Sequence, residues 1–198
     1  MLIKPTEKRY ISQFMAAVEY LNPLEDKCRI RLKSLLYHKR LKKMEYFSKE
    51  NQFPKEFGFV CNGVLRMFYI SEKGEEWNKH FFMDNNFIAA SIELDKKSIS
   101  NIQALTTTNL LCISYSDFLE LRNEFYQFNI FIQKLFISYL KQKEEKEIRF
   151  LSNTTIDNYK YFKTQYPNLE NIISHYHIAS YLGITPTQLS RIRKKMKK

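Results

Sequence analysis

The C-terminal sequence HIASYLGITPTQLSRIRKKMKK constrains the fold more than any other stretch of this chain. Gly183 can adopt the left-handed conformation that ends a helix. Thr185 followed by Pro186 is a typical helix start, because threonine can cap free backbone N–H groups and proline lacks one. Apolar residues at helical spacing lie on both sides of this turn: Ile178, Ala179 and Leu182 before it, Leu189 and Ile192 after it. The segment is therefore predicted to be two short helices that cross at a tight turn, a helix-turn-helix.

The outward face of the second helix carries side chains suited to double-stranded DNA. Arginine can bind guanine through two hydrogen bonds in the major groove, and hydroxyl and amide groups reach bases or phosphates. The helix start suits a phosphate, and the cations beyond it add affinity without sequence preference. The predicted DNA-binding residues are Thr185, Pro186, Thr187, Gln188, Ser190, Arg191, Arg193 and Lys194. The alternative, a solvated basic tail on a helical hairpin, would not require the Gly–Ile–Thr–Pro turn.

Composition agrees with an anionic partner. Lys and Arg number 32 against 21 Asp and Glu, which gives a formal net charge of +11. Such a surplus favours nucleic acid, an acidic membrane surface or an acidic protein. Cys28, Cys61 and Cys112 are far apart and form no CxxC pair, so we expect buried thiols in a reducing compartment. Because no signal-peptide core and no apolar run of about 18 residues occurs, we expect a soluble cytoplasmic protein with no membrane partner.

The preceding residues change from a helical to a strand pattern and back. Thr6–Leu21 has one apolar helical face. From about Leu24 to Tyr115, short apolar or alternating runs are separated by turns. VLRMFYI and WNKHFF flank the hairpin connection SEKGEE, and SISNIQALTTTNLLCIS is interpreted as two more strands. This spacing predicts a small antiparallel barrel or sandwich, which we assign to residues 1–115.

A long helix is predicted after this domain. Ser116 is expected to cap a short helix, and a second helix is expected from about Tyr126 to Phe150. Apolar residues recur along it at coiled-coil steps: Phe125, Phe128, Ile132, Leu135 and Tyr139. They would suit a core helix that covers the barrel, but the width of the apolar face favours a dimer interface as well. We assign residues 116–151 to dimerisation and, after a break at Ser152–Thr155, residues 152–198 to the helix-turn-helix domain.

Several of these segments together resemble the Crp/Fnr family of bacterial transcription regulators, most closely the branch common in Bacteroidetes. The C-terminal signature of that branch is close to YIASYLGITPETLSRIRKK, and this chain has HIASYLGITPTQLSRIRKK. TTIDNYKYFKTQYPNL resembles the connecting helix of the family, FVCNGVLRMFYISEKGEE its β-roll segment, and IQALTTTNLLCISYSDFLEL the passage into the dimer helix. The similarity covers nearly the whole chain and is weakest in the first 25 residues.

The resemblance implies an α+β fold. It comprises an N-terminal cyclic-nucleotide-binding-like β-roll with flanking helices, a long dimerisation helix and a C-terminal helix-turn-helix. By the pattern of the family, Pro186, Thr187 and Arg191 face bases, whereas Thr185 and Gln188 face phosphates. The implied function is sequence-specific transcription regulation by a homodimer on a pseudo-palindromic operator, with RNA polymerase and a small-molecule effector as further partners.

Two departures from the family pattern matter. The cyclic-nucleotide cassette resembles FGE followed by an R-S/T/A pair, whereas this chain has FIAASIELDKKSIS. Ile88 and Ala89 replace the glycine and glutamate, and Ser98 and Ile99 replace the arginine and its neighbour, so we expect no cyclic AMP binding of the usual kind. The winged helix is also abridged, because little room for a hairpin exists between Pro167 and Ser174. The Fnr-type iron–sulfur cysteines are missing, and no cofactor is identified.

Other chemistry finds little support in the sequence. His175 and His177 would face different sides of a helix, and His80 is the only histidine of the hairpin segment. We therefore expect neither a metal site nor an enzyme. Two alternatives stay open: a small-molecule-binding or protein-interaction module with only non-specific DNA affinity, and a β-roll enzyme that holds a metal.

Overall fold

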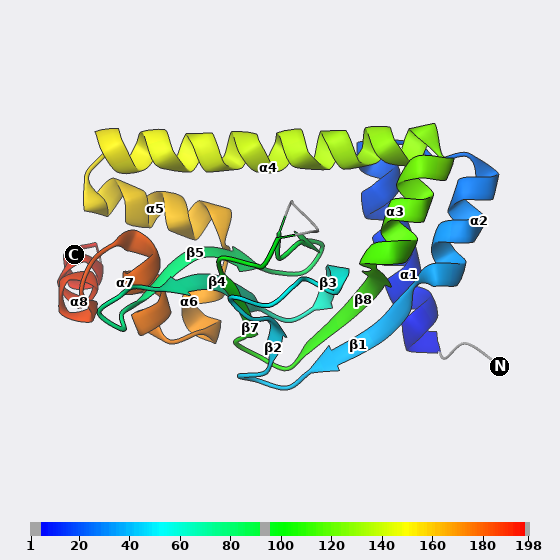
Figure 1. The fold of residues 1–198 in the computed structure, drawn as a ribbon. Helices are drawn as coiled ribbons and strands as arrows, with labels where there is room; N and C mark the ends of the chain where they lie inside the picture. The colour runs from blue at the N-terminus through cyan, green and yellow to red at the C-terminus, as the bar shows by residue number, and fades with distance from the viewer. Residues whose placement is uncertain (1–4, 92–95, 197–198) are drawn as a thin grey trace. The chain divides into compact units, whose positions relative to one another are not determined.

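The computed structural model of the chain describes residues 5–91 and 96–196 (Figure 1). Its helices are α1 (Pro5–Leu21), α2 (Asp26–Leu35), α3 (Tyr115–Glu124), α4 (Tyr126–Ser152), α5 (Thr155–Gln165), α6 (Leu169–Ile172), α7 (His175–Leu182) and α8 (Pro186–Lys195). Its strands are β1 (Tyr37–Leu41), β2 (Tyr46–Ser48), β3 (Glu56–Asn62), β4 (Leu65–Ile70), β5 (Glu76–Phe82), β6 (Phe87–Ile88), β7 (Asn101–Ala104) and β8 (Thr108–Ser114). The predicted α+β class is confirmed.

The strands form two four-stranded sheets, with orders β1-β8-β3-β6 and β2-β7-β4-β5. In the first sheet β8 is antiparallel to both β1 and β3, with Cys112 opposite Tyr37 and Gly58. Buried apolar side chains from both sheets form one core: Leu41, Phe47, Val60, Leu65, Met67, Phe82, Ile88, Ala90, Ile102, Ala104, Leu110 and Cys112. This is the predicted β-roll, with a filled interior.

The chain divides into two compact units, and the division passes through β4 and β5. The first unit comprises Met1–Met67 and Phe81–Ser138, and the second comprises Phe68–His80 and Tyr139–Lys198. The sequence-based division at residues 115 and 151 had placed the whole β4–β5 hairpin with the β-roll. In the structure, Phe68–His80 of this hairpin belongs to the same compact unit as the C-terminal helices, which it contacts; the domain bounds themselves stay a prediction.

In the first unit, α1, α2 and α3 pack with the beginning of α4 around a second apolar core (Figure 1). Aromatic rings dominate it: the ring centroids of Phe14 and Phe59 are 5.4 Å apart, as are those of Phe118 and Phe128. Such edge-on ring pairs add to the burial of apolar area. This core holds the first part of α4 in place.

Two local predictions in this unit are wrong. Residues predicted to begin the strand zone form α2, whose fully buried side chains are only Cys28 and Leu32, so its helical period is weak in the sequence. The cap of α3 is Ser114 rather than Ser116, because the Ser114 side chain accepts a hydrogen bond from the backbone N–H of Asp117. Ser116 lies inside the first turn of α3.

Candidate nucleic-acid interface and sensor region

The α7–α8 hairpin has the local geometry that the sequence predicts. The Ser174 side chain caps α7, and Gly183 ends it in the left-handed conformation with φ 68°. The backbone N–H of Ile184 then donates to the carbonyl of Ala179 over 3.0 Å, which satisfies an otherwise free carbonyl at the helix end. A side chain at Gly183 would be strained because of its positive φ.

The start of α8 is a complete capping box. Thr185 accepts from the backbone N–H of Gln188 over 3.2 Å, and the Gln188 side chain accepts from the backbone N–H of Thr185 over 2.9 Å. Pro186 occupies the first turn. The box satisfies two free donors of the helix start. The Gln188 side chain therefore acts in the cap of its own helix, at a position that was predicted to face a phosphate.

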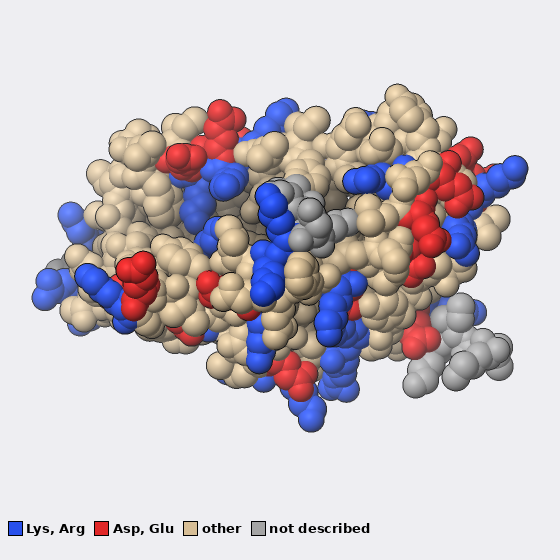
Figure 2. Space-filling model, in the orientation of Figure 1, with Lys and Arg blue, Asp and Glu red and all other residues tan. Residues whose placement is uncertain are grey.

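The inner and outer faces of α8 differ sharply. Ile178, Ala179 and Leu182 of α7 are buried together with Leu189, which is only 1% exposed. The predicted DNA-binding residues that are exposed are Thr185, Pro186, Thr187, Gln188, Ser190, Arg191 and Lys194. In the space-filling view, basic side chains project from the part of the surface where α8 lies (Figure 2). α8 thus presents a polar, basic face over an apolar base.

Arg193 was also predicted to face DNA, but its side chain contacts its own chain. Its Nη1 donates to His175 Nδ1 over 3.1 Å, and its Nε lies 3.7 Å from a carboxylate oxygen of Glu170. Glu170 also accepts a short hydrogen bond from the Tyr159 hydroxyl. Arg193 therefore ties α8 to α5, α6 and α7, a role that the local pattern did not reveal.

The predicted absence of a hairpin between Pro167 and Ser174 agrees with the structure, in which α6 occupies that segment. Asn168 precedes it with φ 62°. Within the described part of residues 152–198 no strand is formed. Phe68–His80 of the β4–β5 hairpin belongs to the second unit together with these helices.

The predicted dimer residues, Phe125 at the end of α3 and the others on α4, mostly pack against their own chain. Phe125 and Phe128 are 7% and 1% exposed, and Ile132 and Leu135 pack against the same core. Tyr139 contacts the His80 ring, with centroids 6.4 Å apart. The sequence shows that α4 has apolar faces, but not which of them its own chain covers.

A different apolar stripe of α4 is exposed. Ile137, Leu140, Ile148 and Leu151 are between 51% and 83% exposed. With Glu144 between them they follow steps of three and four residues, which is coiled-coil spacing on one face of a helix. An exposed stripe of this kind is a typical helix-pairing surface.

The cassette region is only partly described, because residues 92–95 of FIAASIELDKKSIS lie outside the described residues. Ile88 and Ala90 are buried in the β-roll core, as is Phe82. Ser98, which replaces the arginine of the family, is 1% exposed and donates to the carbonyls of Ala90 and Ser100. These side chains pack the protein itself, and Ser98 supplies no cation for a cyclic phosphate.

The free thiols are buried, as predicted. Burial raises the pKa of Cys28 to about 11 and that of Cys61 to about 12. Burial also raises the pKa of Cys112. Thiols that stay protonated at neutral pH are poor nucleophiles and metal ligands. Among the described residues no group of three His, Cys, Asp or Glu side chains is placed to hold a metal.

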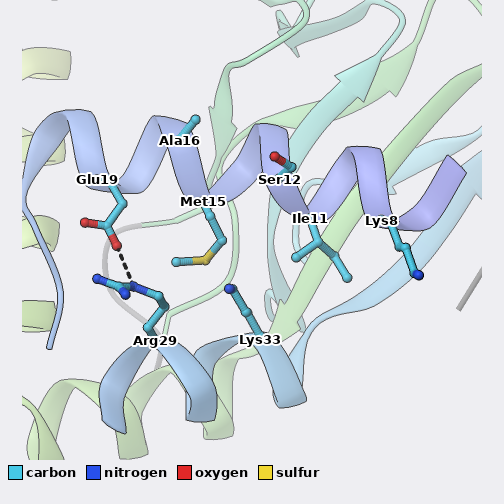
Figure 3. A pocket seen from close by; sticks show the side chains of 8 residues that line it. All are labelled: Lys8, Ile11, Ser12, Met15, Ala16, Glu19, Arg29 and Lys33. Carbon is cyan, nitrogen blue, oxygen red and sulfur yellow. Dashed lines mark hydrogen bonds and ion pairs between the residues drawn. The ribbon is translucent and has the colours of Figure 1, made fainter. Parts of the chain in front are cut away.

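An open groove lies between α1 and α2, with a volume of about 480 Å³ (Figure 3). Ile11, Met15 and Ala16 of α1 line it, and Lys8 and Lys33 stand at its side. Arg29 of α2 pairs with Glu19 over 3.0 Å across it. No sequence signal pointed to this groove, and its cations face solvent. Along the described chain, no helix combines the length and apolarity needed to cross a membrane.

Comparisons with known proteins show which families and structures this chain resembles. Residues 38–125 match the family model "Cyclic nucleotide-binding domain". No curated protein sequence matches the chain.

Solved structures match nearly the full length of the chain. FixK2 of Bradyrhizobium japonicum has a TM-score of 0.74 at 14% identity, over 82% of this chain and 84% of that one. A Eubacterium rectale protein assigned to the Crp/Fnr transcriptional regulators gives 0.70 at 15%, over 88% and 84%. The c-di-GMP-responsive global regulator CLP of Xanthomonas campestris gives 0.64 at 13%, over 87% and 92%. Residues 38–125 therefore resemble the cyclic nucleotide-binding domain, and the chain has the fold seen in solved structures of Crp/Fnr-type transcription regulators.

Proposed function

We propose that the protein is a sequence-specific DNA-binding transcription regulator and not an enzyme. The observation that carries the proposal is the face of α8: a capped helix on a buried apolar base that exposes Thr187, Ser190, Arg191 and Lys194. The fold of the Crp/Fnr-type regulators supports it. A basic tail without this base would bind DNA by charge alone.

In this proposal α8 enters the major groove. Arg191 is the base-reading side chain, because a guanidinium can bind guanine O6 and N7 together. Thr187 and Ser190 contact bases or phosphates beside it. The α8 start receives a phosphate, because the helix dipole and the backbone N–H that the capping box leaves free favour an anion there. Arg193 holds α8 in register through Glu170 and His175, and so acts through the helix rather than on the DNA.

We propose a homodimer that pairs through the exposed stripe of α4, Ile137, Leu140, Ile148 and Leu151, in place of the predicted interface. Such pairing would remove these apolar side chains from water. Two copies of α8 would then read half-sites about one helical turn apart, ~34 Å between centres. The operator should accordingly be an inverted repeat.

We propose further that the β-roll is a sensor that does not use cyclic AMP in the usual way. The packing of Ile88, Ala90 and Ser98 into the protein supports this part of the proposal. CLP, a structural neighbour, is described as responsive to c-di-GMP, so a sensor role in this fold is compatible with another ligand.

A selection from random duplex DNA tests the proposal. The purified full chain is used at near-physiological salt, so that binding by charge alone is suppressed. Enrichment of an inverted repeat is the expected result. The variant Arg191→Ala, run in parallel, should lose the preference at one base pair of each half-site. Affinity that follows charge alone, with no enriched sequence for the wild type, would contradict the proposal and favour a non-specific interaction module.

A further inference from the structure

One face of α4 is directed at β5 within the second unit. Tyr139 and Lys146 lie seven residues apart on α4, two helical turns, and therefore on the same side of the helix. Tyr139 contacts the ring of His80, and Lys146 contacts the backbone of Lys79. Lys143 lies between them in sequence, and its charge helps to lower the pKa of Lys79 after the effect of burial, so it stands near the same strand. Lys79, Lys143 and Lys146 therefore converge between α4 and β5.

The ammonium group of Lys146 is enclosed by a backbone carbonyl and aromatic rings, an unusual environment for a lysine. Its Nζ donates to the Lys79 carbonyl over 2.8 Å and lies 3.8 Å from the Tyr181 ring centroid and 5.1 Å from that of Phe150. Burial lowers the pKa of Lys146 to about 8, and the charge of Lys79 adds to this effect. The rings and the carbonyl stabilise the ammonium group only in part. Among the described residues, no carboxylate forms an ion pair with this cation.

The described groups that neighbour Lys146 supply no negative charge either. Burial and the charge of Lys143 lower the pKa of Lys79. Burial, and to a smaller extent the charge of Lys146, lowers the pKa of His80 to about 4, so His80 is neutral at pH 7. Its Nδ1 lies 3.2 Å from the Tyr166 hydroxyl. In the described part of the chain, none of the three lysines forms an ion pair with a carboxylate.

Converging cations without a counter-charge repel one another, and an anion placed among them would reverse that cost. Compact ammonium groups suit the oxygens of a phosphate, to which they donate charge-assisted hydrogen bonds. Lys143 is exposed, so the cluster can be reached from solvent. We propose that Lys79, Lys143 and Lys146 form a binding site for a small phosphate-bearing anion, the effector of the regulator. This rests on the proposed regulatory function.

The site is connected to the DNA-reading helices by direct contacts. Tyr181, beneath Lys146, belongs to α7. The Ser180 hydroxyl of α7 contacts the edge strand β5. It accepts from the Asn78 N–H over 3.0 Å and donates to the Glu76 carbonyl over 2.6 Å. The Asn78 side chain donates to the His177 carbonyl over 3.0 Å. An anion that changes the position of β5 or Lys146 therefore acts on α7, and through it on α8.

The test is calorimetric titration of the full chain with inorganic pyrophosphate at constant ionic strength and without DNA. Lys146→Met and Lys79→Met should each weaken binding by roughly tenfold or more. Lys141→Met is the matched control: it removes the same charge from an exposed position of α4, about 200° around the helix from Tyr139. It should bind as the wild type does. Equal affinity of Lys146→Met and Lys141→Met would overturn the proposal.

A pH series gives a second readout, one that does not depend on a destabilised variant. Binding to the wild type should weaken as the pH rises through about 8, because Lys146 loses its proton there. Lys146→Arg keeps its charge and should retain binding at about pH 9. A wild-type affinity that does not change across this range would overturn the role of Lys146.

DNA could instead occupy the cluster. Pyrophosphate would then not bind the free protein, while Lys146→Met would weaken DNA binding, and this result would overturn the effector site without touching the proposed regulator. Conversely, saturable pyrophosphate binding with no enriched DNA sequence would leave the anion site in place and contradict the regulator.

Discussion

Two groups of cations in the second unit have the same charge and opposite environments. Arg191 and Lys194 project from α8 into solvent, whereas Lys79 and Lys146 lie half-buried between β5 and α4. The first group is backed by the apolar base of α8, and the second by aromatic rings and a backbone carbonyl. The difference shows that net charge alone does not assign a function to a basic residue.

The two environments predict different dependences on solution conditions. Exposed cations interact through a screened field, so their contribution to DNA binding should fall with salt. Burial lowers the pKa of both half-buried lysines, that of Lys146 to about 8, and neighbouring lysine charges lower them further, so their contribution should change with pH. Salt and pH therefore distinguish the two groups.

The largest expected effect comes from truncating Leu189, the buried apolar side chain on which the exposed face of α8 rests. Leu189→Ala deletes a buried side chain and should destabilise the α7–α8 hairpin by about 2–5 kcal/mol, because a cavity replaces its contacts. Thermal unfolding measures the loss, and DNA binding should fail with it. Ser190→Ala, on the exposed face of the next position, should change stability by less than about 0.5 kcal/mol. Equal stability of the two variants would contradict the packing of α8.

Next in size is the loss of the base-reading side chain. Arg191→Ala should cost about 1–3 kcal/mol on the selected operator and relax the preference at one base pair, because one bidentate contact is lost. Fluorescence anisotropy with the operator and with base-substituted operators measures both quantities. If affinity fell equally on every DNA sequence, Arg191 would be a phosphate contact rather than a reader.

How far the sequence could predict these regions follows from the range of the contacts involved. The α7–α8 hairpin was predicted nearly to the residue because Gly183, Thr185 and Pro186 obey local rules of helix ends. The strands of the β-roll followed from turn residues and alternation in the same way. α2 was missed because only two of its side chains are fully buried, too few for a clear helical period.

The contacts that escaped prediction join residues distant in sequence. Lys146 meets Lys79 across 67 positions, and Asn78 meets Ser180 across 102. The tie from Arg193 to His175 and the choice of which α4 face packs inward also depend on the assembled unit. No periodicity reports such pairings, so the half-buried cations looked like ordinary solvated lysines.

An effect of comparable size should appear in the pH dependence of stability, through His80 beside the half-buried lysines. The folded pKa of His80 is lowered from 6.5 to about 4 by burial and by Lys146. Between these values the unfolded chain binds a proton that the folded chain does not, so stability falls as the pH drops from 6.5 to 4. His80→Gln should lack this component, which is on the order of 1–3 kcal/mol. Chemical denaturation of both proteins at several pH values measures it, and parallel stability curves would contradict the burial of His80.

The smallest effect concerns a single exposed cation. Lys194→Ala should lower DNA affinity alike on all sequences and reduce the slope of log affinity against log salt by about 1, because one counterion fewer is released. The selected sequence preference should stay the same, and titrations at four salt concentrations measure the slope. Lys146→Met is the informative comparison, because the half-buried lysine contacts Lys79 of β5 and Tyr181 of α7 rather than projecting from α8, and should leave this slope unchanged. A slope that responds equally to both substitutions would show that the two groups of cations form one DNA-binding surface, and the distinction between them by environment would fail.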